Sequence, residues 1–188
     1  MYRAFFKRLF DVTFAVVSLV ILAPVMLVVA ICIKAEDHGQ VLFRQRRVGL
    51  NDEHFDFLKF RSMPEETSDA AKADAVALPV TKIGRLIRRT NLDELPQLFN
   101  ILRGEMSVVG PRPPIPSQTH LCLLRDANGA SACLPGLTGL AQVKGYDGMP
   151  ETEKAQWDGN YAANVSFLND IKIIAQTFKY IMKRPPVY

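Results

Sequence analysis

The stretch Thr90-Asn-Leu-Asp-Glu-Leu-Pro-Gln-Leu-Phe-Asn100 places two adjacent carboxylates, Asp93 and Glu94, where a helix is expected to begin. The apolar residues that follow are spaced so that they form a stripe on one helical face. Pro96 fits only the first turn of a helix, where its missing N–H costs little, so a start near residues 91–93 is predicted. The carboxylates would then lie at the positive end of the helix dipole, which keeps an acid ionised and attracts phosphate.

The same pair also has a purely structural interpretation. Asn91 and Glu94 have the spacing of a capping box, and Asp93 would itself serve as a helix cap. The surrounding charges favour a chemical role instead, because carboxylates set among arginines are what metal-assisted phosphoryl transfer requires. These arginines are Arg85, Arg88, Arg89 and Arg103, together with Arg112 in the rigid turn Gly110-Pro-Arg-Pro113.

The composition limits the possible partners. The chain has 188 residues, enough for one domain, and a net charge of +4, which predicts an anionic partner such as a membrane surface, a phosphorylated substrate or a nucleic acid. Basic and aromatic residues do not alternate as they do in proteins that bind single-stranded nucleic acid, so no nucleic acid partner is expected. The three cysteines are widely spaced and predict neither disulfides nor a zinc site.

A membrane segment is predicted near the N-terminus. Residues 2–11 form an amphipathic lead-in, and residues 12–33 carry no charge. A straight helix over that run would be about 33 Å long, enough to span a hydrocarbon core of ~30 Å. Pro24 divides the run, however, and cationic residues flank both ends, which favours a re-entrant helix with both flanks on the cytoplasmic side. A proline-kinked spanning helix is the alternative.

The following segments predict a small, mainly helical α+β domain. Residues 41–45 and 55–60 alternate like strands around the loop 48–52, which predicts a β-hairpin with Lys59 as a candidate phosphate contact or an edge lysine. Residues 64–80 predict a loop or short helix over the site, and residues 82–89 an amphipathic helix at the headgroup level.

Two later segments each have two interpretations. The glycine-rich segment 134–145 predicts either a ligand loop or two simple turns. The final amphipathic helix is predicted to start at Ser166, and its apolar face fits either the membrane surface or the protein core. Asp158, Tyr161 and Asp170 precede or enter this helix and are candidates to complete a polar site.

Over residues 6–183 the chain resembles the small monotopic phosphoglycosyl transferases that start bacterial glycan assembly. The matching stretches are Lys7-Arg-Leu-Phe-Asp11, Pro24 in the membrane segment, Lys59-Phe-Arg-Ser-Met63, Arg88 with Leu92-Asp-Glu-Leu-Pro-Gln-Leu98, Met106-Ser-Val-Val-Gly-Pro-Arg-Pro113, Pro135-Gly-Leu-Thr-Gly139 with Ala141-Gln-Val143, and Asp158-x-x-Tyr161 through Asn164-x-Ser166 to Asp170-Ile-Lys172. They cover nearly the whole chain in the same order.

The resemblance implies a re-entrant membrane helix over residues 1–36 and a catalytic domain over residues 37–188 at the cytoplasmic face of the bacterial inner membrane. It implies transfer of a phosphosugar from a UDP-sugar to undecaprenyl phosphate with release of UMP. Asp93 would be the nucleophile, and Asp93 and Glu94 would hold Mg²⁺. The expected phosphate, nucleotide or other substrate contacts are Arg112, Lys59, Arg88, Gln142, Asp158 and Tyr161.

The chain departs from the family pattern in the loop expected to face the nucleotide sugar. Leu140 stands where tryptophan is common, and Lys144 and Tyr146 replace a common asparagine and arginine. The identity of the sugar therefore does not follow from the resemblance. The competing hypothesis is a membrane-anchored interaction module without catalytic activity, in which the Asp-Glu pair only caps a helix.

Overall fold

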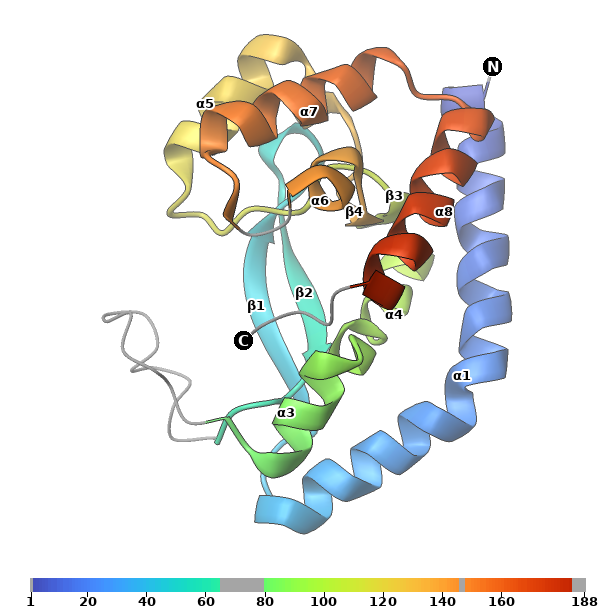
Figure 1. Ribbon diagram of the computed structural model, residues 1–188, viewed down its shortest axis with the longest axis vertical. Coiled ribbons are helices and arrows are strands. Elements are labelled where there is room, and N and C mark those ends of the chain that lie inside the picture. Colours follow the sequence, from blue (N-terminus) through green and yellow to red (C-terminus); the bar gives the residue numbers. More distant parts are fainter. Residues whose placement is uncertain (1, 65–79, 146–147, 184–188) are drawn as a thin grey trace.

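We describe a computed structural model of the chain, which covers residues 2–64, 80–145 and 148–183. A π-helical turn at Tyr2–Phe6 leads into the long helix α1 (Lys7–Asp37). Pro24 lies inside this helix and does not end it, although Figure 1 shows that α1 changes direction about halfway along. A bend is expected there because proline removes one backbone hydrogen bond and clashes with the preceding turn.

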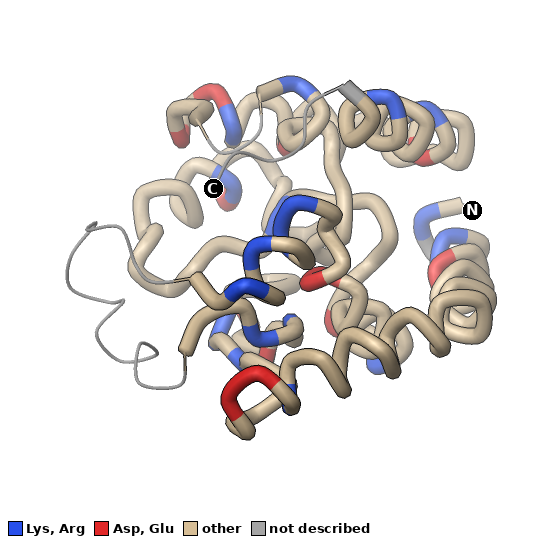
Figure 2. Tube along the Cα trace, turned by 60° about the horizontal axis from the view of Figure 1, so that its bottom comes forward, with Lys and Arg blue, Asp and Glu red and all other residues tan. Residues whose placement is uncertain are grey.

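The predicted apolar helix is confirmed, and Pro24 lies within it. By length and composition α1 is able to cross a membrane. Figure 2 shows that its middle carries neither acidic nor basic residues, and many of its large apolar side chains are exposed, including Val20, Ile21 and Leu27. Whether α1 turns back within the bilayer stays a prediction.

The β-hairpin is confirmed. Strand β1 (Leu42–Val48) pairs with β2 (His54–Phe60) in antiparallel register, from Leu42 opposite Phe60 to Val48 opposite His54. A short 3₁₀ turn, η2 (Leu50–Asp52), joins them. Phe55 and Phe57 point from β2 into the core, where Phe57 is almost fully buried. Lys59 lies on the same strand, opposite Phe43 of β1.

The rest of the described chain is mainly helical and surrounds the hairpin (Figure 1). The elements are α3 (Lys82–Arg89), η3 (Leu92–Glu94), α4 (Gln97–Arg103), β3 (Ser107–Val109), α5 (Thr119–Asn128), η4 (Ala130–Ala132), β4 (Gly136–Thr138), α6 (Leu140–Gly145), α7 (Glu151–Ala163) and α8 (Phe167–Lys183). Strands β3 and β4 pair in parallel. The predicted helices at 82–89 and from Ser166 are confirmed, and the Ser166 hydroxyl accepts a hydrogen bond from the Asn169 N–H at 3.3 Å.

The predicted start of the helix at residues 91–93 is wrong. The chain first forms the 3₁₀ turn η3, and α4 begins only at Gln97, with Pro96 in the capping position. Asn91 adopts a left-handed conformation (φ 55°), and its side chain makes no capping hydrogen bond, so the capping-box interpretation is also wrong. The left-handed Asn91 interrupts the helical path two residues after α3 ends at Arg89, so α3 and α4 do not form one continuous helix.

Two apolar clusters hold the fold together, and each takes one arm of α1. Ala15 from the first arm belongs to the main core with Phe57, Leu98, Ile101 and other buried residues. Val29 and Ile33 from the second arm pack with Phe60 of β2 and with Ile87 of α3. The bend in α1 therefore directs its second arm onto α3 and the end of β2.

Buried polar contacts fasten the start of α1 to the C-terminal helix. Asp170 of α8 is fully buried and accepts hydrogen bonds from Lys7 Nζ at 2.7 Å, the Tyr2 hydroxyl at 2.7 Å and the Tyr161 hydroxyl at 2.9 Å. Asp11, also fully buried, accepts the Val108 N–H at 3.0 Å. These contacts join α1, β3, α7 and α8 into one packed unit, as Figure 1 shows for α1 and α8.

Two expectations fall on parts of the chain that the structure does not describe. The segment predicted to lie over the site, residues 64–80, falls outside the described residues except for its two ends. Tyr146, one of the departures from the family pattern, also lies outside them.

Candidate active site

The two carboxylates lie in η3, between the helices α3 and α4, next to strand β2. Asn100 of α4 fixes this arrangement, because its side-chain oxygen accepts the Leu58 N–H at 3.1 Å and its amide nitrogen donates to the Asp56 carbonyl at 2.7 Å. Asn100 is fully buried, so these bonds are shielded from water. They hold β2 against α4 and bring Lys59 to the carboxylates.

Lys59 forms the first cationic contact of the site. Its Nζ donates to Glu94 Oε1 at 2.8 Å and lies 3.8 Å from Asp93 Oδ2. The aliphatic part of the chain passes the Phe57 ring, whose centroid is 5.5 Å from Nζ. Of the two interpretations of Lys59 left open by the sequence, a cation at the carboxylate site is therefore the one that the geometry supports.

Arg112 forms the second cationic contact of the site, and a tight backbone turn positions its side chain. Its Nη2 donates to Glu94 Oε1 at 2.9 Å, the same oxygen that Lys59 binds. The turn needs glycine at position 110, because an added Cβ would lie 2.2 Å from the Leu134 carbonyl oxygen. Gly136 and Gly139 approach Gly110 equally closely, so these glycines of the segment 134–145 serve backbone packing behind the Arg112 turn.

A buried ion pair supports the Arg112 turn from behind. Arg125 of α5 donates from Nε and Nη2 to Asp158 Oδ2 of α7, at 2.9 and 2.6 Å. Its Nη1 donates to the Arg112 carbonyl at 3.0 Å. Because both members of the pair are almost fully buried, Arg125 holds the backbone of Arg112 in place.

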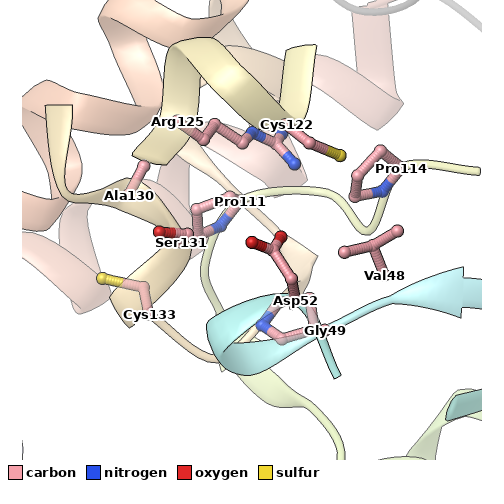
Figure 3. Close-up of a pocket in the computed structure, with 11 residues that line it drawn as sticks. Val48, Gly49, Asp52, Pro111, Pro114, Cys122, Arg125, Ala130, Ser131 and Cys133 are labelled. Atoms are coloured by element: carbon pink, nitrogen blue, oxygen red, sulfur yellow. The ribbon is translucent and has the colours of Figure 1, made fainter. Parts of the chain in front are cut away.

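Figure 3 shows the pocket beside this ion pair, with Arg125 reaching from α5 toward the segment that carries Pro111 and Pro114. Asp52 and Cys122 also line the pocket. Its volume is about 20 Å³, which is room for about one water molecule. The pocket is therefore too small to bind a nucleotide sugar.

The two neighbouring carboxyls have opposite electrostatic environments. Burial raises the pKa of Asp93, although the positive charges of Lys59 and Arg88 partly oppose this rise. Burial also acts to raise the pKa of Glu94, but Arg112 and Lys59 outweigh it and hold that pKa far below its usual range. Glu94 is therefore firmly ionised and neutralised by two cations, whereas burial makes Asp93 easier to protonate than an ordinary aspartate.

Arg88 belongs to the same cluster. It comes from the end of α3, its Nε donates to the Ser62 hydroxyl at 2.7 Å, and its charge acts on Asp93. Figure 2 shows basic segments gathered around an acidic one near the middle of the trace. The structure thus brings together five of the predicted site residues: Asp93, Glu94, Lys59, Arg88 and Arg112.

The hydrogen bonds that the structure shows for the other three predicted residues lead to groups outside this cluster. Asp158 is bound to Arg125, and the Tyr161 hydroxyl donates to the Val109 carbonyl at 2.8 Å and to Asp170. Both are almost fully buried, which fits a positioning role; direct substrate contact by either stays a prediction. Gln142 in α6 is half-buried, and its Oε1 has no hydrogen-bond partner.

Sequence reasoning missed two residues near the site. Arg125 lies in a helix to which no chemistry was assigned, 33 residues from its partner Asp158. Gln97 is fully buried, yet neither atom of its side-chain amide has a hydrogen-bond partner. Gln97 lies within the stretch Leu92-Asp-Glu-Leu-Pro-Gln-Leu98 that matches the family pattern, which is the sequence signal that could have identified it.

The two carboxylates are suitable ligands for a magnesium ion whose remaining ligands would be waters and substrate phosphates. Asp93 Oδ1 is buried without a hydrogen-bond partner, beside a second carboxylate. Among the described residues no group of three or more histidine, cysteine or acidic side chains is placed to hold a metal. Mg²⁺ suits this arrangement, because it is typically bound by one or two carboxylates together with waters and substrate phosphates.

The chain is similar to known bacterial proteins over most of its length. A family model described as "Bacterial sugar transferase" matches residues 2–184. An undecaprenyl-phosphate glucose phosphotransferase of Komagataeibacter xylinus is 46% identical over 92% of the chain and 35% of its own length. A UDP-glucose:undecaprenyl-phosphate glucose-1-phosphate transferase of Caulobacter vibrioides is 39% identical over 97% of the chain and 72% of its own length.

A third relative carries a different sugar in its name. An undecaprenyl-phosphate galactose phosphotransferase of Salmonella typhimurium is 33% identical over 98% of the chain and 42% of its own length. The chain thus spans less than half of the Komagataeibacter and Salmonella proteins.

Proposed function

Because the chain belongs to the bacterial sugar transferase family, we propose that it transfers a phosphosugar from a UDP-sugar to undecaprenyl phosphate and releases UMP. The single observation that supports this most strongly is the Asp93-Glu94 pair in contact with Lys59 and Arg112. The names of the relatives support the same donor and acceptor classes, with glucose or galactose as the sugar.

In the first step, an oxygen of Asp93 attacks the phosphorus that carries the sugar. A bond forms between the carboxylate oxygen and this phosphorus, and the bond from phosphorus to the bridging oxygen breaks. The bridging oxygen leaves with its electron pair as part of UMP. A carboxylate nucleophile needs no general base. Lys59, Arg88 and Arg112 reduce the repulsion between it and the donor, and the first two also favour its ionised form.

In the second step, a phosphate oxygen of undecaprenyl phosphate attacks the same phosphorus. The acyl-phosphate bond breaks, its electron pair returns to Asp93, and the carboxylate is regenerated. The product is the sugar linked to the lipid through a diphosphate. The covalent intermediate conserves the transfer potential of the donor between the two steps.

Asp93 and Glu94 would hold the magnesium ion that the family pattern implies. The ion would neutralise charge on the donor phosphates. The protein's own residues then have distinct roles: Asp93 binds phosphorus, Glu94 keeps Lys59 and Arg112 in place, and Arg125 fixes the backbone that carries Arg112.

The proposed place of action is the cytoplasmic face of the bacterial inner membrane, with α1 re-entrant in the bilayer. The exposed apolar side chains of α1 and α8 support contact with lipid, among them Val20 and Ile21 in α1 and Leu168 and Met182 in α8. At such an interface a water-soluble donor and a lipid acceptor can both reach one carboxylate.

The covalent step is tested by intact mass spectrometry after incubation with the donor alone. We expect the wild type to gain the mass of one phosphosugar from UDP-glucose or UDP-galactose, and we expect Asp93→Asn to form no adduct and release no UMP. Asp56→Asn is a matched control, because Asp56 lies on β2 with a side chain that is 51% exposed.

Two outcomes would contradict the proposal. Donor turnover without an adduct would exclude the aspartyl intermediate. Absence of UMP release from every UDP-sugar tested, with and without Mg²⁺, would favour the interaction module without catalytic activity.

A further inference from the structure

A hydrogen bond to a serine fixes the orientation of Arg88 at the active site. The Nε of Arg88 donates to the Ser62 hydroxyl at 2.7 Å, and the charge of Arg88 acts on Asp93. A guanidinium is planar and carries its five N–H groups in a fixed fork. A bond that holds Nε therefore sets the plane in which the remaining N–H groups of Arg88 point.

Ser62 is itself held in a defined position. It lies two residues after β2 ends, it is buried, and its carbonyl accepts the Thr81 N–H at 3.2 Å. The start of α3 packs directly on its backbone, because a Cβ added to Gly84 would lie 2.1 Å from the Ser62 carbonyl oxygen. The hydroxyl that Arg88 binds therefore has little freedom to move.

The end of α1 holds both partners of this hydrogen bond. Asp37, the last residue of α1, accepts hydrogen bonds from the guanidinium of Arg61, which directly precedes Ser62. Glu36 accepts the first two N–H groups of α3, at 2.7 and 3.1 Å, and so caps the helix that carries Arg88. Figure 1 shows α3 above the last turns of α1. The packing of α1, β2 and α3 thus sets the contact between Ser62 and Arg88.

We propose that Ser62 is a positioning residue: its hydroxyl accepts the Nε–H of Arg88 and orients the guanidinium toward the phosphates of the bound UDP-sugar while Asp93 attacks phosphorus. The inference rests on the proposed function and adds the residue that aligns one of its three cations. Ser62 acts through Arg88 and does not touch the substrate in this role. A guanidinium turned away from the donor would keep its charge but would no longer meet the negative charge that develops in the transition state.

The first test compares Ser62→Ala, which removes the hydroxyl, with Ser62→Thr, which keeps it. At saturating UDP-glucose or UDP-galactose we expect Ser62→Ala to form the adduct about 10-fold more slowly, the order of effect of a hydrogen bond to a charged group. The donor concentration for half-maximal rate should change by less than about twofold, because Lys59 and Arg112 still bind the donor. Ser62→Thr should keep the wild-type rate.

A double-variant cycle tests whether Ser62 acts through Arg88. We expect Arg88→Met to slow adduct formation by about 10²-fold, as for removal of a donor that stabilises charge in the transition state. Adding Ser62→Ala to Arg88→Met should cause no further loss, because the hydroxyl then has no guanidinium to orient. This comparison remains decisive if the added methyl group of Ser62→Thr disturbs the packing.

Thr81→Ala is the matched control, because it removes another hydroxyl that is bonded to α3. The Thr81 hydroxyl accepts the Gly84 N–H at 2.8 Å and caps the start of the helix, at the opposite end from Arg88. We expect its melting temperature to fall by about 3 °C. Its rate of adduct formation should stay at the wild-type value, which separates a loss of stability from a loss of positioning.

The outcomes separate this inference from the proposed function. A wild type that forms no adduct would refute the proposed function and the role of Ser62 with it. A wild type that forms the adduct, with Ser62→Ala equally fast, would refute the role of Ser62 alone. Losses that add up in the double variant would also refute it, since Ser62 would then act independently of Arg88. A slow Thr81→Ala would mean that any loosening of α3 slows the reaction, and it would refute a specific role of the Ser62 hydroxyl.

Discussion

At the scale of single residues, Asp93 and Glu94 make different contacts although they are adjacent. Glu94 binds Lys59 and Arg112 through one oxygen, whereas Asp93 keeps one oxygen without any hydrogen-bond partner. The ionised Glu94 thus organises the cations, and Asp93 remains available for chemistry. The sequence predicted both residues together with their cations, but not this division.

The role of Glu94 predicts a pH-dependent loss of stability in Glu94→Gln. Because the folded-state pKa of Glu94 lies below its ordinary value of 4.5, its stabilisation is fully present above pH 4.5 and is lost as the pH falls below that value. At pH 7 we expect the free energy of unfolding to drop by about 3 kcal/mol, because the variant leaves two partly buried cations without their carboxylate.

Denaturant unfolding at pH 7 and pH 3.5 measures this effect. The difference between wild type and variant should be smaller at pH 3.5. Glu53→Gln, an exposed residue next to β2, should match the wild type at both pH values. An equal loss at both pH values would mean that Glu94 contributes by packing and not by its charge.

At the scale of elements, the spacing of apolar residues along the sequence predicted the helices and strands that depend on local spacing. Alternation predicted the hairpin, and helical periodicity predicted α3 and α8. The start of α4 was misplaced because Pro96 was expected inside the first helical turn, whereas it is the capping residue of α4 and follows the 3₁₀ turn η3. The Arg125–Asp158 pair could not be predicted, because tertiary packing alone brings α5 and α7 together.

The buried Arg125–Asp158 ion pair behind Arg112 predicts two separable effects of Arg125→Met. Leaving Asp158 buried without its partner should lower the free energy of unfolding by about 3–5 kcal/mol. Loosening the Arg112 turn should slow adduct formation by up to about 10²-fold. The double variant Arg125→Met with Asp158→Leu removes both charges and should regain most of the stability but not the rate.

Asn128→Ala is the matched control for the Arg125–Asp158 ion pair. Asn128 also joins α5 to α7, through the Ala155 carbonyl at 2.7 Å, but it does not contact Arg112. We expect a modest loss of stability and a wild-type rate of adduct formation. If the double variant regained the full rate along with its stability, Arg125 would have no positioning role.

At the scale of the whole molecule, the bent α1 contributes to both apolar clusters and leaves much of its surface exposed. The sequence predicted this segment from its missing charges, but it could not give the direction of the second arm. That direction follows from the packing of Val29 and Ile33 against Phe60 and Ile87. The bend therefore belongs to the fold as well as to the membrane segment.

The re-entrant topology is tested by labelling a cysteine at position 3 in a background without the three native cysteines. We expect Arg3→Cys to be protected from a reagent that cannot cross the membrane, because both flanks of α1 would be cytoplasmic. Adding Pro24→Ala restores a backbone hydrogen bond and favours a straight helix, so a fraction of the protein should then be labelled from outside. Val25→Ala, next to Pro24, should keep the protection. Labelling of Arg3→Cys itself from outside would establish a spanning helix.

The contact between Lys7 and Asp170 also has a consequence for biosynthesis. A ribosome adds the 163 residues that separate these partners in roughly 10–30 s. For most of that time the apolar N-terminal segment is already complete, whereas the acid that will bind its lysine does not yet exist. Either the lipid bilayer or a chaperone must shelter the nascent chain until the last helix emerges and locks the first one in place.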